Sequence, residues 1–197
     1  MPIEHEAKVL GVDPAATTAL ILAKGGRSVG ARARMRRYVY DIVPGDRSRW
    51  IRLRDNGSET TLCVKEIRSD TIDGTYEVEV TVADFTAASE LLIMLGFTPK
   101  SYQENRRTSF ILAGAHLEID EWPRIPPYLE IEADTREDVI RVAGLLGYRE
   151  DQLTAANTVD VYAGYGIDLG GIRELRLALD AHRASGQRGS PAKVARA

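Results

Sequence analysis

The chain has 197 residues, of which 44% are hydrophobic and 28% are charged, and its formal net charge is −3. These values are typical of one globular domain with a core of ordinary size, and they exclude a wholly disordered chain. A net charge this small exerts no overall attraction on nucleic acid or on an anionic membrane. Any binding of anions must therefore come from local clusters of charge.

Cys63 is the only cysteine, so no internal disulfide can form, which fits a reducing cytoplasm. We expect its thiol to be a small buried side chain rather than a nucleophile. The N-terminus leads straight into a charged strand without the apolar segment of a signal peptide. No apolar run approaches the roughly 20 residues of a membrane-spanning helix. The sequence therefore predicts a cytoplasmic protein without a membrane partner.

The first predicted element is a strand at residues 3–9. Because side chains alternate along a strand, Glu4, Glu6 and Lys8 project together from one face. Residues two apart lie about 6.5–7 Å from each other, so one divalent cation could bind both carboxylates with help from other strands. Without a cation, the two like charges repel each other.

Turn, cap and alternation signals divide the rest of the chain into strands and helices. Strands are predicted at residues 31–40, 50–54, 60–67, 75–82, 106–112, 115–120 and 128–133. Helices are predicted after the capping residues Asp13, Asp84 and Thr135, with weaker helical segments at 158–162 and 172–184. The proline-rich stretch 122–127 is predicted to be a loop, and the basic tail from residue 185 is predicted to be disordered.

Two further patterns concern organisation. The sequence Glu-x-Glu occurs on three predicted strands, at 4–6, 77–79 and 130–132, and a capped helix follows each one. This indicates a repeated strand–helix unit. The stretch 24–37 is strongly basic and contains no acidic residue. It is interpreted as a solvated edge strand, with guidance of anions toward a site as the alternative.

The predicted strands are apolar on one face and charged on the other. The charged positions are Glu4, Glu6, Lys8, Arg52, Arg54, Lys65, Glu77, Glu79, Glu118, Asp120, Glu130 and Glu132. An open antiparallel sheet with one face in water would also alternate in this way. Such faces usually mix the two signs of charge within a strand, whereas here acidic and basic strands are largely segregated. Closure of the sheet into a barrel would focus these charges on a bound anion.

The basic and the acidic positions suit one ligand, a triphosphate with a bound divalent cation. A triphosphate carries several negative charges and many acceptor oxygens, so it requires several arginine and lysine donors. Carboxylates do not bind phosphate directly, but they bind Mg²⁺ or Mn²⁺, which in turn binds phosphate oxygens. A site with both sets is what metal-assisted phosphoryl or nucleotidyl transfer requires.

The motif Glu4-x-Glu6-x-Lys8 resembles the ExExK signature of the CYTH superfamily, the triphosphate tunnel metalloenzymes. This superfamily includes class IV adenylyl cyclases, thiamine triphosphatases and inorganic triphosphatases. The resemblance continues in order through Arg52, Arg54, Lys65, Glu77, Glu79, Arg106, Arg107, Asp120, Glu130 and Glu132. It implies an α+β fold in which an eight-stranded antiparallel β-barrel forms a tunnel, with helices packed on the outside. The tunnel domain would comprise residues 1–169, followed by a C-terminal helix and a disordered basic tail at 170–197.

The resemblance also implies roles for individual residues. The implied metal ligands, for Mg²⁺ or Mn²⁺, are Glu4, Glu6, Asp120, Glu130 and Glu132. The implied substrate-binding residues are Lys8, Arg52, Arg54, Lys65, Arg106 and Arg107, although the sequence leaves open which of the last two faces inward. The implied catalytic residues are Lys8, Arg54 and Glu79. One departure is that no lysine lies between Lys100 and Lys193, where several triphosphatases have a functional one.

Three functions follow from this resemblance. The leading one is metal-dependent hydrolysis of a nucleoside, thiamine or inorganic triphosphate. The alternatives are a class IV adenylyl cyclase that converts ATP to cyclic AMP and pyrophosphate, and a non-catalytic sensor of polyphosphate or nucleotide. A nucleic-acid-binding barrel would need aromatic residues for base stacking, and aromatics are only 7% of the chain. The expected partner is thus a small triphosphate, with no nucleic acid and no membrane, and a homodimer is left open.

Overall fold

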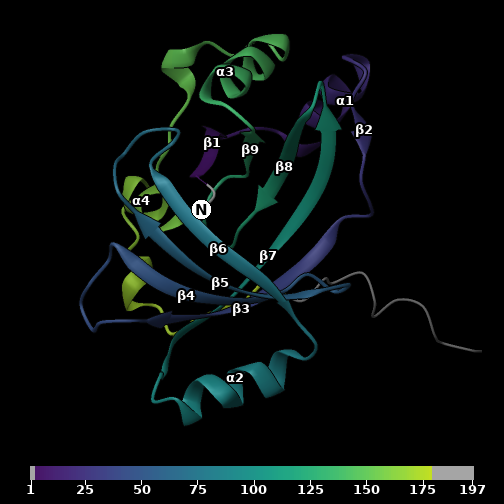
Figure 1. Cartoon of the computed structure of the whole chain (residues 1–197). Coiled ribbons are helices and arrows are strands. Elements are labelled where there is room, and N and C mark those ends of the chain that lie inside the picture. The colour runs from purple at the N-terminus through teal and green to yellow at the C-terminus, as the bar shows by residue number, and fades with distance from the viewer. Residues whose placement is uncertain (1–2, 179–197) are drawn as a thin grey trace, which may run out of the picture.

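The computed structural model describes residues 3–178, and its central feature is one closed sheet. The strands that form the ring are, in spatial order, β7 (Pro99–Leu112), β3 (Ala33–Asp41), β4 (Arg49–Asp55), β5 (Thr60–Ile67), β6 (Thr75–Val82), β1 (Ile3–Leu10), β9 (Tyr128–Ala133) and β8 (Ala115–Glu121). Because β8 also pairs with β7, the eight antiparallel strands close into a barrel (Figure 1). The predicted fold is therefore confirmed.

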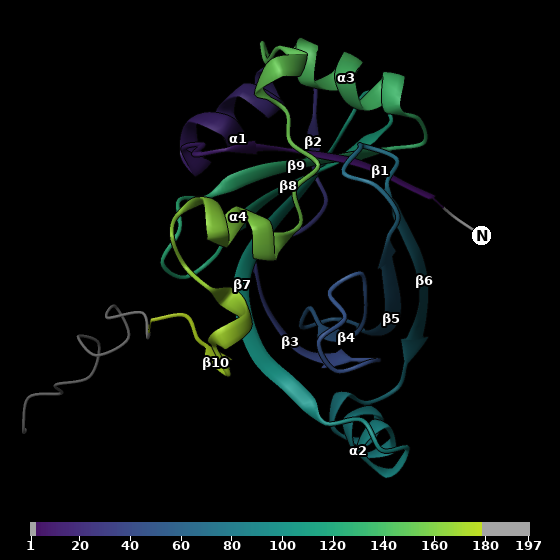
Figure 2. The same ribbon diagram turned by 90° about the vertical axis from the view of Figure 1, so that its left-hand side faces the viewer.

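Four α-helices lie outside the barrel in the described chain: α1 (Pro14–Ala23), α2 (Phe85–Met94), α3 (Arg136–Leu145) and α4 (Thr158–Gly164). The first three begin where the sequence predicts, because Asp13, Asp84 and Thr135 each accept a hydrogen bond from the backbone N–H three residues later. Helices α1 and α3 lie on one side of the barrel and α2 lies at the opposite side (Figure 2). None of the helices in residues 3–178 is both long and apolar enough to cross a bilayer.

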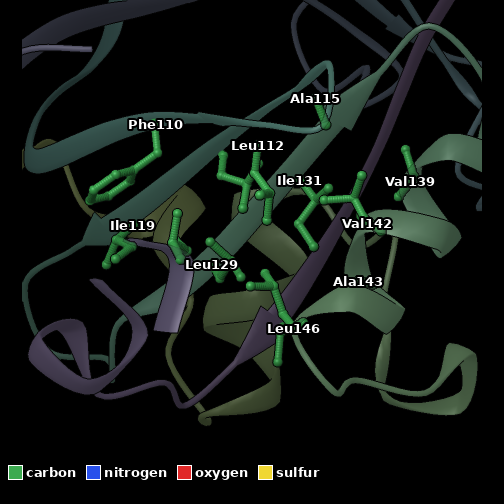
Figure 3. Close-up of a cluster of buried hydrophobic side chains, with 14 of the residues drawn as sticks. Phe110, Leu112, Ala115, Ile119, Leu129, Ile131, Val139, Val142, Ala143 and Leu146 are labelled. Carbon is green, nitrogen blue, oxygen red and sulfur yellow. The ribbon is translucent and has the colours of Figure 1, made fainter. Parts of the chain in front are cut away.

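The main hydrophobic core lies outside the barrel wall, between the wall and the helices. Figure 3 shows Val142 of α3 beside Ile131 of β9, and Val139 and Leu129 belong to the same buried cluster. Leu117 of β8 belongs to the same cluster and is completely buried. The apolar faces of β1, β8 and β9 therefore point outward to the helices, and the opposite faces line the interior of the barrel.

The interpretation of the basic stretch 24–37 as an edge strand is wrong. Strand β3 is paired on both sides, with β7 and with β4. The outward-facing arginines of β3 form ion pairs with acidic residues of the two strands beside it. Arg34 pairs with Glu104 of β7, and Arg36 pairs with Asp55 of β4. Charged side chains protect a strand from further pairing only where that strand is an edge, and β3 is not an edge.

The C-terminal region also differs from the prediction of a helix at 172–184. The described part contains a 3₁₀ turn (Leu169–Gly171) and the short strand β10 (Glu174–Leu175), while residues 179–197 lie outside the described residues. The strand β7 begins at Pro99 rather than at residue 106, and its added length offers Tyr102 and Gln103 as parallel partners for β10. A second short strand, β2 (Arg27–Ser28), also pairs with β7. The predicted helix at 158–162 and the loop at 122–127 are confirmed.

Truncation of the outer core should destabilise the protein. We expect Ile131→Ala to lower the free energy of unfolding by about 2–5 kcal/mol, because it leaves a cavity between β9 and α3. Urea unfolding followed by circular dichroism measures this change. The matched control is Ile93→Ala on α2, where the side chain is 52% exposed and the expected change is within about 0.5 kcal/mol. Equal losses in the two variants would contradict this location of the core.

Candidate functional site

Alternation along the strands directs one set of side chains from each barrel strand to the interior. The pairing registers align the acidic ones on three neighbouring strands. Glu6 on β1 lies opposite Glu132 on β9, and Lys8 lies opposite Glu130. Glu130 in turn lies opposite Glu118 on β8. The three strands therefore carry a group of neighbouring carboxylates with one lysine, Lys8, among them. We call this group the acidic band; its members are Glu4, Glu6, Glu118, Glu130 and Glu132.

The barrel encloses a cavity of about 490 Å³, which is the size of pockets that bind small organic molecules. The sequence-predicted site residues that line it are Glu6, Lys8, Arg52, Lys65, Arg107, Asp120 and Glu130. Those that share the inner strand faces beside these lining residues are Glu4, Arg54, Glu79 and Glu132. Arg106 is the exception, because it alternates with Arg107 and lies on the outer face of β7, opposite Arg34 and Glu121.

Strands β4 and β5 provide the cations of one wall. Arg52 donates hydrogen bonds to Glu77 and Glu79, each at 2.8 Å. The ammonium group of Lys65 lies 2.7 Å from a carboxylate oxygen of Glu77 and 2.7 Å from one of Glu4. Buried charges in this arrangement hold each other in fixed positions, so the wall presents oriented donors to the cavity.

Several donors of this wall remain unused. The Nε–H groups of Arg37, Arg52 and Arg54 are buried and have no hydrogen-bond partner within residues 3–178. Burial and the neighbouring Arg52 and Arg107 lower the pKa of Arg54, although a guanidinium stays protonated in proteins. Each buried donor without an acceptor costs roughly 1–3 kcal/mol. An anion with many oxygens would offer acceptors to donors of this kind.

Arg107 occupies the opposite wall and is tied to an acidic group. Its Nε and Nη2 atoms donate to the two oxygens of Asp120, each at 2.7 Å. It also forms ion pairs with Glu118 and, at 3.5 Å, with Glu130. Burial would lower the pKa of Arg107, but Asp120 and Glu118 raise it well above its ordinary value. Asp120 is fully buried and also accepts a hydrogen bond from Asn105, so both of its oxygens are occupied.

Lys8 lies buried between two carboxylates. Its ammonium group is 2.8 Å from Glu6 and 3.5 Å from Glu130. Burial by itself would lower the pKa of Lys8, but these two carboxylates outweigh it and raise the pKa above the ordinary value. Lys8 therefore remains a cation at physiological pH and acts as a hydrogen-bond donor rather than as a base.

The acidic band carries more negative charge than these cations balance. No cation of residues 3–178 forms an ion pair with Glu132, and burial together with Glu130 and Glu118 raises its pKa. Burial also raises the pKa of Glu118, despite Arg107. The pKa of Glu4 rises to about 8, first through burial and then through a hydrogen bond shared with Glu77. Burial and the neighbouring carboxylates thus favour the protonated forms of Glu4, Glu118 and Glu132, and the nearby Lys65 and Arg107 do not outweigh them. The carboxylate oxygens fit Mg²⁺ or Mn²⁺.

A second set of potential ligands does not fit a metal as well. Cys63, Glu77 and Glu79 each place one ligand atom within 4.8 Å of the others. Burial raises the pKa of Cys63 to about 12, so the thiol stays protonated and binds metal poorly. Arg52 contacts both glutamates, and Lys65 contacts Glu77. We therefore assign no metal to this group.

Sequence reasoning missed two inward-facing residues. The sequence places Glu118 on the charged face without indicating a role, and it places Arg37 in the basic stretch 24–37. The pattern around Arg37 offers no signal of orientation, since Met35 and Val39 face inward with it while Tyr40 is buried on the outer face. Only the pairing register of β3 with its two neighbours reveals that Arg37 lies in the tunnel.

Comparison with known proteins was made at the levels of sequence and structure. No family sequence model matches the chain, and no curated protein matches it. A "conserved hypothetical protein" from Pyrococcus furiosus has a similar structure, with a TM-score of 0.68 and 22% identity over 80% of this chain and 98% of that chain. A "putative adenylate cyclase" from Vibrio parahaemolyticus gives a TM-score of 0.69 and 14% identity, over 82% of this chain and 98% of that one.

A third similar structure comes from Hippeastrum. It is a "putative adenylyl cyclase" described as having a dominant triphosphatase activity, with a TM-score of 0.59 and 19% identity over 86% of this chain and all of that chain (100%). At these identities the likeness shows a shared fold. It agrees with the tunnel fold that the resemblance to the CYTH superfamily implied.

The raised carboxyl pKa values make the stability of the metal-free protein dependent on pH. A carboxyl whose pKa is higher in the folded state, as for Glu4 at about 8 against 4.5, binds more protons when folded, so stability falls as pH rises between the two values. We expect the unfolding temperature in EDTA to fall from about pH 5 to about pH 8, and Glu132→Gln to reduce this slope. Differential scanning calorimetry across this range measures both. Glu77 and Glu130 have lowered pKa values, so their effect on stability falls below the range from pH 5 to pH 8.

Addition of Mg²⁺ should reverse the trend. Metal binding requires deprotonated carboxylates, so saturating Mg²⁺ should raise the unfolding temperature more at pH 8 than at pH 6. The same calorimetric series with Mg²⁺ in place of EDTA tests this. A stability that rises with pH in EDTA, or a Mg²⁺ effect that is independent of pH, would contradict the assignment of the acidic band.

Proposed function

We propose that this protein is a divalent-metal-dependent enzyme that binds a triphosphate in its tunnel and hydrolyses it. The observation that carries the proposal is one cavity with two incomplete charge sets. One wall has buried guanidinium donors without acceptors, and the other has buried carboxylates without enough cations. A triphosphate with a bound divalent cation supplies what both walls lack.

The phosphate-binding set consists of Lys8, Arg52, Arg54, Lys65 and Arg107. Arg106 is left out because its position on the outer face of β7 removes it from the cavity. The metal-binding set consists of Glu4, Glu6, Glu130 and Glu132, with Glu118 added from the structure. We assign Asp120 to the positioning of Arg107 rather than to the metal, because both of its oxygens accept hydrogen bonds from protein donors.

A divalent cation in the acidic band would polarise phosphate oxygens and lower the pKa of a bound water. The chain's own residues do the rest. Arg52 and Arg54 neutralise the charge that develops on the phosphoryl oxygens. Glu79 contacts both arginines, at 2.8 and 3.4 Å, so its role is to orient them. Lys8, which Glu6 holds as a cation, donates a hydrogen bond to the phosphate chain.

The second candidate is a class IV adenylyl cyclase. The match to a "putative adenylate cyclase" structure from Vibrio parahaemolyticus favours it. The similar structure from Hippeastrum, described as having a dominant triphosphatase activity, favours hydrolysis. A non-catalytic sensor would need the arginines but not the acidic band, and the surplus of carboxylates in that band argues against it. The single buried, unpaired cysteine supports placing the enzyme in the cytoplasm.

The decisive experiment offers the protein three substrates. It is incubated with ATP, thiamine triphosphate or tripolyphosphate, in Mg²⁺ or in Mn²⁺, and phosphate, pyrophosphate and cyclic AMP are resolved by chromatography. We expect release of phosphate without cyclic AMP. Formation of cyclic AMP with equimolar pyrophosphate from ATP would establish the cyclase instead. Metal-independent binding without turnover of any substrate would establish the sensor.

Substitutions in the two charge sets should abolish most of this activity. We expect Glu6→Gln and Arg54→Ala each to lower kcat/KM by about 10²–10³-fold. The first removes a proposed ligand of the divalent cation, and the second removes a cation that neutralises charge on the phosphoryl oxygens in the transition state. Circular dichroism confirms that the variants fold. The matched control is Arg68→Ala, whose side chain is 59% exposed and paired with Glu66, and its activity should equal that of the wild type. Activity retained in both site variants would refute the assignment.

A further inference from the structure

Arg37 differs from the other buried cations that face the tunnel. Each of the others has a carboxylate within ion-pair distance; they are Lys8, Arg52, Arg54, Lys65 and Arg107. Arg37 forms no ion pair with any carboxylate in the described part of the chain, although it is only 7% exposed. A guanidinium is costly to bury without a counter-charge. Its burial here indicates a place for an anion.

The contacts of Arg37 hold the group but do not neutralise it. Its Nη2 atom donates to the amide oxygen of Asn105 at 2.5 Å, and its guanidinium carbon lies 4.6 Å from the centre of the Trp122 ring. Both partners are uncharged, although an aromatic face attracts a cation. The Nε–H remains buried without an acceptor, and Arg37 lines the cavity. One donor is therefore left for a ligand.

The position of Arg37 on the sheet strengthens this inference. Arg37 on β3 lies directly opposite Arg54 on β4, and two like charges in directly opposed positions destabilise a sheet. Arg54 likewise has a buried Nε–H without an acceptor. Burial, together with Arg52, Arg54 and Arg107, lowers the pKa of Arg37 to about 9 although the charge of Asp120 opposes this shift, and Arg37 stays charged at neutral pH. An anion held between the two guanidiniums would offset their repulsion and offer acceptors to their donors.

We propose that Arg37 is a further phosphate-binding residue, which together with Arg54 clamps one phosphoryl group of the substrate between β3 and β4. The identity of the anion as a polyphosphate rests on the proposed function. The clamp itself follows from the paired, unsatisfied guanidiniums. Asn105 and Trp122 fix the orientation of Arg37, so its free donor is positioned before the ligand arrives.

Binding of inorganic tripolyphosphate in EDTA, measured by isothermal titration calorimetry, tests the clamp without metal and without turnover. We expect Arg37→Gln to weaken binding by about 10- to 100-fold, through the loss of charge-assisted hydrogen bonds. The matched control is Arg36→Gln, at the next position of the same strand. Its side chain faces outward, is 48% exposed and pairs with Asp55, so this variant should bind as the wild type does.

A structural role for Arg37 makes a different prediction. It would lower the unfolding temperature of the anion-free variant and leave the affinity for tripolyphosphate unchanged, and that result overturns the proposal. Absence of metal-free binding in the wild type overturns it as well. Should Arg37→Gln not fold, Arg37→Lys keeps the charge but loses the planar fork, and we expect about tenfold weaker binding. Wild-type affinity in Arg37→Lys would then refute the clamp.

The clamp and the proposed function can fail separately. Wild-type protein that binds tripolyphosphate in EDTA but cleaves no triphosphate refutes hydrolysis and leaves the clamp intact. An active enzyme in which Arg37→Gln keeps wild-type affinity supports hydrolysis and refutes the clamp.

Discussion

The structure depends on one constraint, which is that the closed barrel turns charged faces inward and leaves them to balance each other. The apolar faces pack outside, where α1 and α3 cover β1, β8 and β9. Buried ion pairs contribute little net stability, because the cost of removing charges from water offsets their attraction. Apolar side chains inside the barrel would stabilise the fold at least as well. The charged interior is thus best explained by a ligand, and the outer core carries the stability that makes this interior possible.

Within the interior, the charges are arranged so that cations and carboxylates share partners. Glu130 contacts both Lys8 and Arg107, and Glu77 contacts both Arg52 and Lys65. Each of these donors is therefore held in place before a ligand arrives. Among the cations on the inner face in residues 3–178, Arg37 alone has no carboxylate at ion-pair distance. Such sharing fixes the geometry of long side chains that would otherwise lose entropy on binding. It also means that a change in charge at Glu130 alters the environment of the acidic band and of Arg107 together.

Strand alternation explains why so much of the site could be predicted. Glu4, Glu6 and Lys8 had to share a face, and short turns and helix caps fixed the order of the elements around them. What alternation does not give is the absolute orientation of a strand with no clear apolar face. In β3, Met35 and Arg37 face the same way, so composition could not tell inside from outside. The strand β10 was missed for a related reason, since its pairing depends on a length of β7 that no local signal marks.

The register of β7 shows how core and site depend on each other. Phe110 and Leu112 belong to the outer core, and the period of two then places Arg107 inside the tunnel and Arg106 outside it. A shift of the strand by one residue would move both apolar side chains into the charged interior and expel Arg107 from its pairing with Asp120. The same apolar contacts that stabilise the barrel therefore select which arginine reaches the cavity. Position in the site is, for this strand, a consequence of packing on the opposite face.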